Sequence, residues 1–387
     1  MKIIDRIIKM QLNLAAKNFS AIVLTGPRRC GKSYLLRKLL PRASYVLLED
    51  PDVLLRIRSD ARAFIDSLML PVILDEIQNA PELFAYIRTR IDAAPRKTGQ
   101  WFLTGSQEAP LMQGVSESMA GRAAIFQLMP IAREESTRVS ALYGGFPEVL
   151  ARPVARRIWF ASYIQTYLER DVRAVLNVRN LSTFRRFLSL VATRHGQVLN
   201  RSDFAAPLGL TVPAISEWLK VLETTGLLLI VPPYFSNLGK RIIKSPKIYL
   251  CDSGLACHLL GIQSQAELLR SPFLGAITEG IVACELTKAL INRGYRRELY
   301  FFRDQQGLEV DFILPHRGQT YLIEVKTSST PIPAMTKPLQ QLALAFNDTP
   351  TRAVLVHGDT RSNPKLTALA PGIEAKTLNG LIAEMFA

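Results

Sequence analysis

The chain has 387 residues, of which 48% are hydrophobic and 21% are charged. This length predicts two or three domains, and the composition excludes a mainly disordered or collagen-like chain. The net charge is +15, which favours a polyanionic partner, either nucleic acid or an anionic membrane surface.

Cysteine spacing and hydropathy indicate the cellular compartment in which the protein is expected. The four cysteines are scattered and no pair has C-x-x-C spacing, so we expect neither a disulfide framework nor a ribbon-type zinc site. No apolar run reaches 18 residues, and the first residues lack the pattern of a signal peptide. We therefore expect a cytoplasmic protein with no membrane span.

A phosphate-binding loop is expected after the first strand. Residues 21–25 are an apolar run, residues 26–33 match G-x-x-x-x-G-K-[ST] at every fixed position, and a helical pattern follows. In this context the backbone N–H groups and the helix N-terminus surround phosphates, Lys32 reaches the β- and γ-phosphates, and Ser33 holds Mg²⁺. The expected nucleotide-binding residues are Gly26, Pro27, Arg28, Arg29, Cys30, Gly31, Lys32, Ser33 and Tyr34.

Two acids end the next strong strand pattern, at residues 70–76. We expect Asp75 to bind Mg²⁺, directly or through water. Glu76 is expected to orient and deprotonate the attacking water. Many phosphate-transferring kinases lack this second acid, so the pair favours hydrolysis of ATP over transfer to another substrate.

A further strand is expected at residues 100–107, with a polar tip beside the γ-phosphate where Ser106 or Thr104 is a candidate sensor. Arg122 is a candidate arginine finger, and a plain surface arginine fits its position equally well. With another strand at residues 45–50, the alternation of strands and helices predicts an α/β ATPase domain with a parallel sheet over residues 1–150.

The middle region, residues 151–250, carries 15 Lys/Arg and 5 Asp/Glu, whereas residues 251–387 carry 13 of each. Residues 153–194 have a helical pattern with one apolar face. A short helix, a turn, a helix capped by Thr211 and ended by Gly226, a strand, a basic loop and a strand then follow, which is the order of a winged helix.

In a winged helix the second helix enters a major groove. The expected outward side chains are those of Thr211, Pro213, Ser216, Glu217 and Lys220, and the expected phosphate contacts are Lys240, Arg241 and Lys244. Basic faces are often only solvated, and this helix has a single lysine and two glutamates. DNA contact is therefore expected, and a protein-docking or oligomerising role stays open.

The last region, residues 251–387, contains strand patterns at 298–303, 309–314 and 319–326. Asp311 and Glu324 converge across one hairpin, and Lys326 lies on the same strand face as Glu324. This is the nuclease pattern D-x(n)-E-x-K, in which carboxylates hold Mg²⁺ and the lysine orients or activates water. Glu279, on an upstream helix, is a candidate third carboxylate. A plain salt bridge, or a fold retained without cutting, stays open.

Taken together, these motifs resemble the prokaryotic AAA-type P-loop ATPase family whose C-terminal part is a restriction-endonuclease-like (PD-(D/E)XK-type) domain of unknown function. The resemblance covers nearly the whole chain and rests on residues 25–33, 74–78, 103–106, 121–122, 167–172, 279–280, 309–312 and 323–326. It implies ATPase roles for Lys32, Ser33, Asp75 and Glu76, and nuclease-like positions for Asp311, Glu324 and Lys326. The proline usual before the first nuclease aspartate is Val310 here.

We therefore expect a Mg²⁺-dependent ATPase that acts on DNA or is regulated by it, with an uncertain nuclease function. The alternative is an ATP-gated switch that binds a protein or a nucleic acid and does not cleave. A small-molecule kinase is disfavoured by Glu76. The sequence leaves the oligomeric state open.

Overall fold

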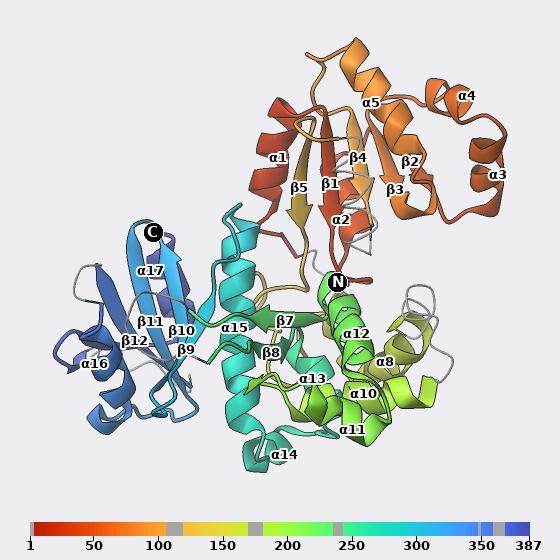
Figure 1. The fold of residues 1–387 in the computed structure, drawn as a ribbon. Helices are drawn as coiled ribbons and strands as arrows, with labels where there is room; N and C mark the ends of the chain where they lie inside the picture. Colours follow the sequence, from red (N-terminus) through yellow and green to blue (C-terminus); the bar gives the residue numbers. More distant parts are fainter. Residues whose placement is uncertain (1–3, 106–118, 169–180, 235–242, 347–349, 359–367) are drawn as a thin grey trace.

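The computed structural model describes residues 4–105, 119–168, 181–234, 243–346, 350–358 and 368–387. Three bodies are visible in Figure 1, and the long helix α15 (Leu274–Asn292) runs between the second and the third. None of the helices in these ranges is both long and apolar enough to cross a membrane.

The N-terminal domain is built on a five-stranded parallel sheet with the order β2-β3-β4-β1-β5. Its strands are β1 (Ala21–Thr25), β2 (Ser44–Leu47), β3 (Val72–Asp75), β4 (Trp101–Thr104) and β5 (Ala123–Gln127). Its helices are α1 (Lys9–Asn18), α2 (Lys32–Leu39), α3 (Pro51–Ser59), α4 (Ala61–Asp66), the 3₁₀ turn η1 (Ile77–Asn79) and α5 (Leu83–Ala93).

Helices cover both faces of this sheet. Alternate residues of β1 point to opposite cores: Ile22 and Leu24 pack with α1 and α2, and Ala21 and Val23 pack with the side of α4 and α5. Strands β1, β3 and β4 are buried along their whole length, which explains their unbroken apolar sequences. The parallel α/β sheet expected for the first region is thereby confirmed.

The middle domain combines helices with a small antiparallel sheet of order β6-β8-β7. Its elements are α7 (Pro147–Ala151), η2 (Pro153–Ala155), α8 (Arg156–Tyr163), η3 (Ile164–Leu168, π-helical), α10 (Leu181–Thr193), β6 (Gln197–Val198), α11 (Ser202–Leu208), α12 (Val212–Thr224), β7 (Leu228–Val231), β8 (Lys247–Leu250), α13 (Ser253–Leu259) and α14 (Gln265–Arg270). Leu255 and Ala256 of α13 belong to its core, so the packing of this domain extends past the expected boundary at residue 250.

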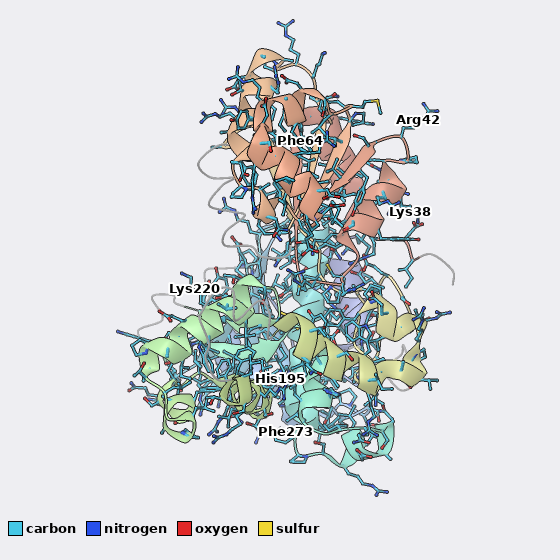
Figure 2. The ribbon with its side chains drawn as sticks, turned by 90° about the vertical axis from the view of Figure 1, so that its right-hand side faces the viewer. Lys38, Arg42, Phe64, His195, Lys220 and Phe273 are labelled. Carbon is cyan, nitrogen blue, oxygen red and sulfur yellow. The ribbon has the colours of Figure 1, made fainter. Side chains whose placement is uncertain are left out.

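Local signals place helix α12 as expected. Thr211 is its N-cap, and the Thr211 hydroxyl accepts a hydrogen bond from the Ala214 N–H at 3.3 Å. Gly226 follows the helix with φ of 72°, a left-handed conformation that favours glycine. Figure 2 shows Lys220 of this helix at the surface and His195 inside the domain.

The C-terminal domain is a six-stranded mixed sheet of order β13-β14-β12-β11-β10-β9. After α15 come β9 (Tyr300–Arg303), β10 (Glu309–His316), β11 (Gln319–Lys326), η4 (Pro333–Thr336), α16 (Lys337–Ala343), β12 (Thr351–His357), β13 (Ala368–Ala370), β14 (Ile373–Lys376) and α17 (Leu378–Met385). Strands β9, β10 and β11 are antiparallel neighbours, and β12 lies parallel to β11. Helices α15 and α17 pack on one face of the sheet and α16 on the other.

The middle and C-terminal domains share a core. Leu229 and Val231 of β7 and Tyr249 of β8 pack with residues of α15 and of the C-terminal sheet. The chain after β7 also joins strand β9, because the Tyr234 N–H donates to the Phe301 carbonyl at 2.8 Å. Strand β8 is thus held between two domains.

Candidate functional site

The loop between β1 and α2 has a backbone that requires glycine. Gly26 has φ of 137°, and a Cβ there would lie 2.1 Å from the Leu128 carbonyl oxygen. Gly31, directly before α2, has φ of 99°. Any side chain at Gly26 would force the loop away from the end of β5, so the motif glycine keeps the loop closed against the sheet.

The side chains of this loop are divided between the binding site and the core. The Lys32 ammonium donates to the Gly26 and Pro27 carbonyls at 2.9 and 3.0 Å, which holds it over the loop. Cys30 is buried, and burial raises the pKa of its thiol, so Cys30 serves packing. Arg28 lies 3.5 Å from Glu49, and Arg29 lies 3.7 Å from Glu148 of α7.

Asp75 stands at the end of β3 among three hydroxyl groups. Its Oδ1 accepts from the Ser33 hydroxyl at 2.9 Å and from the Thr104 hydroxyl, and its Oδ2 accepts from the Tyr45 hydroxyl at 2.6 Å. Burial, and then the hydrogen bond to Asp75, raise the pKa of Tyr45, which therefore remains a protonated donor. The structure thus places Ser33 and Asp75 side by side.

Ser33 and Asp75 fit a magnesium ion. A hydroxyl and a carboxylate oxygen are hard ligands, and Mg²⁺ is usually held by one or two such groups together with substrate phosphates. Over the described ranges no group of three His, Cys, Asp or Glu side chains is arranged to hold a metal. An ion here would therefore be held jointly by the protein and the nucleotide.

Glu76 follows Asp75 in a left-handed conformation, with φ of 61° and ψ of 51°. Its N–H donates to the Thr104 hydroxyl at 3.2 Å, and its carboxylate accepts from the Gln78 amide at 2.5 Å. Such a conformation costs about 1–3 kcal/mol in a residue other than glycine and is concentrated at functional sites. Thr104 therefore contacts the Asp75 carboxylate and the Glu76 backbone, whereas Ser106, the other candidate sensor, lies outside the described residues.

A cavity of about 590 Å³ connects these groups, a size that suits a nucleotide. Its walls include the loop, Asp75 and Glu76. Side chains from elsewhere complete it: Ile4, Asp5, Arg6 and Lys9 at the start of the chain, and Pro147, Glu148 and Ala151 of the middle domain. The sequence analysis missed these residues, because no local pattern marks a cavity wall contributed by another domain.

Arg122 lies away from this cavity. Its guanidinium pairs with Asp92 at 2.6 and 3.0 Å, and its carbonyl accepts from the Ala21 N–H, at the start of β1. The phosphate-binding loop follows the opposite end of β1. The candidate role of Arg122 as an arginine finger therefore stays a prediction, and in this arrangement it would require the nucleotide of a neighbouring chain.

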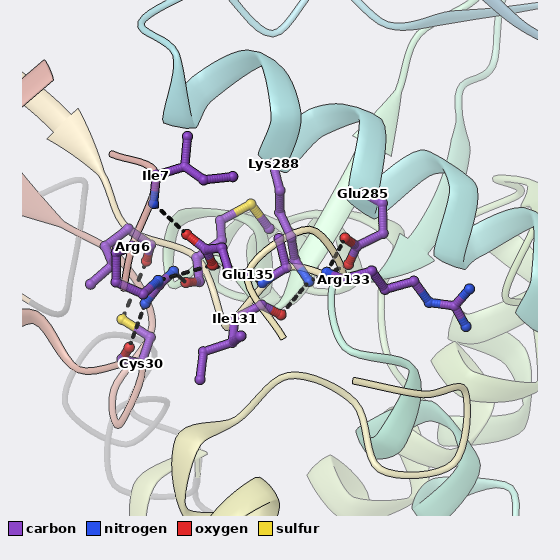
Figure 3. A network of polar contacts seen from close by, with 11 residues as sticks. Arg6, Ile7, Cys30, Ile131, Arg133, Glu135, Glu285 and Lys288 are labelled. Carbon is purple, nitrogen blue, oxygen red and sulfur yellow. Dashed lines mark hydrogen bonds and ion pairs between the residues drawn. The ribbon is translucent and has the colours of Figure 1, made fainter. Parts of the chain in front are cut away.

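A polar network ties the loop to the rest of the molecule (Figure 3). Arg6 donates to the Cys30 carbonyl at 3.3 Å and to the Glu135 carboxylate at 3.0 Å. On the same connecting segment, the Ile131 carbonyl accepts from the Lys288 ammonium of α15 at 3.3 Å. The segment that contains Ile131 and Glu135 is thus hydrogen-bonded both to Arg6, which lines the nucleotide cavity, and to α15, the first helix of the C-terminal domain.

The C-terminal residues singled out from the sequence do come together. Asp311 on β10 accepts from the Val325 N–H at 2.8 Å, and Lys326 lies 2.6 Å from Glu324 on β11. Glu279 approaches from α15. Burial and the charge of Asp311 raise the pKa of both Glu279 and Glu324 to about 7.

A side chain that the sequence analysis did not assign to this site occupies its centre. The Lys247 ammonium, from β8, lies 2.8 Å from Glu279, 2.6 Å from Glu309 and 3.8 Å from Asp311. The Lys247 side chain is only 3% exposed. Burial alone lowers the pKa of Lys247, but the three carboxylates raise it above its usual value, so the ammonium is charged.

The magnesium site expected of Asp311, Glu324 and Glu279 coincides with this cluster. These carboxylates form no metal-holding group in the described structure, and a lysine ammonium stands between two of them. The pairing of Glu324 with Lys326 is present, and the cation beside Glu279 comes from β8; the metal site expected of these carboxylates stays a prediction.

The fold and the first site define a P-loop ATPase. Residues 18–137 match the model of an AAA domain, residues 134–266 a domain of unknown function (DUF8612), and residues 274–370 another (DUF4143). The chain is 33% identical over 331 residues to two curated relatives, covering 83% of this chain and 73% of each. They are the uncharacterised proteins Mb2031c of Mycobacterium bovis and Rv2008c of Mycobacterium tuberculosis.

The chain therefore belongs to the family of these two mycobacterial proteins, and it is an ATP-binding protein with an AAA-type ATPase domain. Among solved structures, it is similar to the Walker-type ATPase PABY2304 of Pyrococcus abyssi (19% identity, TM-score 0.47, 66% of this chain and 96% of that chain). It is also similar to a RuvB variant of Thermotoga maritima (18% identity, TM-score 0.32, 58% and 89%).

Proposed function

We propose that this protein is a Mg²⁺-dependent ATPase that binds DNA through its middle domain and couples that binding to the nucleotide site. The observation that carries the proposal is a contact between the two regions. Gly226, at the end of α12, lies so close to the phosphate-binding loop that a Cβ there would be 2.9 Å from Pro27 Cγ. A displacement of α12 would therefore press on the loop that holds the phosphates.

The middle domain supports DNA as the ligand by its topology. The order α10, β6, α11, α12, β7, β8, with a β6-β8-β7 sheet, is that of a winged helix, in which α12 is the recognition helix. Thr211, Pro213, Glu217 and Lys220 are exposed and Ser216 is partly so. Lys240 and Arg241 lie outside the described residues.

The charge of this domain supports the same ligand. In its described part the exposed basic side chains are Arg152, Arg157, Arg185, Arg186, Arg194, Arg201, Lys220, Lys244 and Arg270. Basic side chains that contact phosphates release counterions, which makes affinity for DNA strongly dependent on salt.

The hydrolytic step follows from the first site. Lys32 and the loop would bind the phosphates, and Ser33 and Asp75 would hold a Mg²⁺ ion, which would neutralise charge on the phosphates. Glu76 then takes the proton of the attacking water. The Thr104 hydroxyl orients the Asp75 carboxylate and accepts from the backbone N–H of Glu76.

For the C-terminal domain we propose a restriction-endonuclease-like fold, because α15, β9, β10, β11, α16 and β12 follow one another in the order of that core. The buried Lys247 among its carboxylates favours the alternative in which this arrangement does not cleave. The domain would then serve the switch as a binding or regulatory part.

The test is ATP turnover with and without duplex DNA, at two salt concentrations. We expect DNA to stimulate turnover several-fold, with Lys32→Ala inactive in both conditions. We expect Lys220→Glu to weaken the stimulation, and the matched reversal Lys97→Glu, at an exposed position of the ATPase domain, to leave it unchanged. DNA affinity should fall about tenfold per tenfold rise in salt for each phosphate contact. Turnover that is indifferent to DNA would reject DNA as the ligand and favour a protein partner.

A further inference from the structure

The carboxylate cluster of the C-terminal domain receives its positive charge from a different domain. Lys247 lies on β8, which pairs with β7 through Val231 and with β6 through Val198. The carboxylates lie on α15 and β10. We propose that the Lys247 ammonium is a built-in cation that occupies this cluster and excludes divalent metal ions while β8 is packed against the C-terminal domain. The inference does not rest on DNA binding or on ATP turnover.

The contacts of Lys247 are those of a fixed ion. Two carboxylate oxygens lie within 2.8 Å of its nitrogen, and a third lies at 3.8 Å. The Phe301 ring lies beneath it, with its centre 5.5 Å from the nitrogen. Tyr249, two residues further on the same face of β8, donates its hydroxyl to Glu279 at 2.5 Å. The strand thus presents two donors to one glutamate.

The remaining carboxylate oxygens are mostly engaged by groups other than Lys247. One oxygen of Asp311 is engaged by the Val325 N–H, and one oxygen of Glu324 by Lys326. The other oxygen of Glu324 is buried with no hydrogen-bond partner among the described residues. A divalent ion needs several such oxygens at short range, and at that range a neighbouring ammonium repels it.

Part of the cluster is reachable from solvent. A groove of about 830 Å³ is lined by Glu309, Asp311 and Glu324, with Lys337 and Gln341 of α16 on its other wall. A metal ion has a path to these carboxylates through the groove, and Lys247, which is 3% exposed, lies behind Glu309 and Asp311 at 2.6 and 3.8 Å. Because Lys247 belongs to the same small sheet as β7, movement of the middle domain away from the C-terminal domain would withdraw the ammonium.

Removal of the ammonium gives the test. In Lys247→Met the carboxylates lose their buried counter-ion, so we expect the melting temperature in EDTA to fall by roughly 5–10 °C relative to the wild type. A metal ion that binds the folded state only must raise it again. We expect millimolar Mn²⁺ to restore most of this loss, to leave the wild type within about 1 °C, and to have no effect once Asp311→Asn is added.

Lys288→Met is the matched control. Lys288 is equally buried and lies 2.7 Å from a single glutamate, Glu285. We expect this variant to lose stability without recovery in Mn²⁺. Recovery of Lys288→Met to the same extent, or a Lys247→Met protein as stable as the wild type in EDTA, would overturn the proposal.

A second measurement uses the wild type, so that the test survives poor folding of Lys247→Met. Binding of Mn²⁺ is followed by electron paramagnetic resonance without nucleotide or DNA, on the wild type and on Asp311→Asn. Equal binding by the two proteins is expected. Wild-type binding that Asp311→Asn abolishes would mean that the cluster admits a metal beside Lys247, and the proposal would be wrong whatever the outcome of the DNA experiment.

Discussion

The two carboxylate sites of this protein have opposite surroundings. Asp75, at the end of a strand, is held by the hydroxyls of Ser33, Thr104 and Tyr45. Hydroxyl groups orient a carboxylate without neutralising it, so its charge remains for a cation and its nucleotide. In the C-terminal domain Glu279 is held by the ammonium of Lys247, which supplies that cation itself. The partner, rather than the acid, distinguishes a site that is ready for a metal from one that is filled.

The largest effects expected from this comparison are at Lys32 and Glu76. Glu76→Gln should lower kcat for ATP by about 10²–10⁴-fold, the range of a general base, while nucleotide binding is retained. Lys32→Ala should abolish hydrolysis, because the phosphates lose their charged partner. Single-turnover hydrolysis and binding of a fluorescent ATP analogue separate the two effects.

The matched control for Glu76 is Glu82→Gln, an exposed acid of the same domain, which should leave kcat unchanged. Normal turnover in Glu76→Gln would remove Glu76 from the water-activating role. It would also weaken the comparison of the two sites, because Glu76 would then have no role in the chemistry beside Asp75.

A smaller effect is expected at His195, which supports strand β8, the strand that carries Lys247. The Nδ1 atom of His195 accepts from the Leu250 N–H at 3.0 Å, and α15 makes room for the ring with Gly280, where a Cβ would lie 2.0 Å from its Nε2. Burial lowers the pKa of His195 to about 4. The unfolded chain binds this proton near pH 6.5, so the free energy of unfolding contains a contribution that is full above pH 6.5 and is lost between pH 6.5 and 4.

The size of this contribution is about 3 kcal/mol. Urea unfolding of the wild type and His195→Gln at pH 7, 5.5 and 4.5 measures it. Glu279 and Glu324 act in the opposite direction, because their raised pKa values favour the folded state as pH falls. They are present in both proteins, so the difference between the proteins isolates the histidine. Parallel pH profiles would contradict a neutral, buried His195.

The first site was largely predictable because its parts are local. Residues 21–39 contain the strand, the loop and the helix in one stretch, and Asp75 ends a continuous apolar strand. The edge strand β5 was missed, since its residues are only partly buried and carry no alternating pattern. Ser33 and Asp75 are 42 residues apart, but each belongs to a local motif from which its position at the same edge of the sheet can be predicted.

The second site was predictable only in part. Asp311, Glu324 and Lys326 lie on one hairpin, so their approach follows from strand register. Lys247 is 32 residues from Glu279 in sequence and enters through the packing of one domain on another. No periodicity or motif near residue 247 indicates a buried cation, because an apolar strand with a leading lysine is typical of any edge of a sheet. Long-range ion pairs of this kind are decided by tertiary packing alone.

The smallest effect expected is at Tyr45, which positions Asp75 from the outer strand β2. Its ring is held independently by Arg37, whose guanidinium lies 4.9 Å from the ring centre, so Tyr45→Phe removes the hydroxyl and leaves the packing. A hydrogen bond to a charged group contributes about 1.5–3 kcal/mol, and Asp75 keeps two other donors. We therefore expect the Mg²⁺ concentration for half-maximal turnover to rise only about 3–10-fold, with kcat at saturating Mg²⁺ nearly unchanged.

Tyr86→Phe, on α5 of the same domain, should have neither effect. A large fall in kcat at saturating Mg²⁺ would mean that Tyr45 does more than orient Asp75. The Tyr45 hydroxyl, an uncharged donor, would then affect the hydrolysis step itself. The two carboxylate sites would in that case differ in catalysis as well as in cation binding.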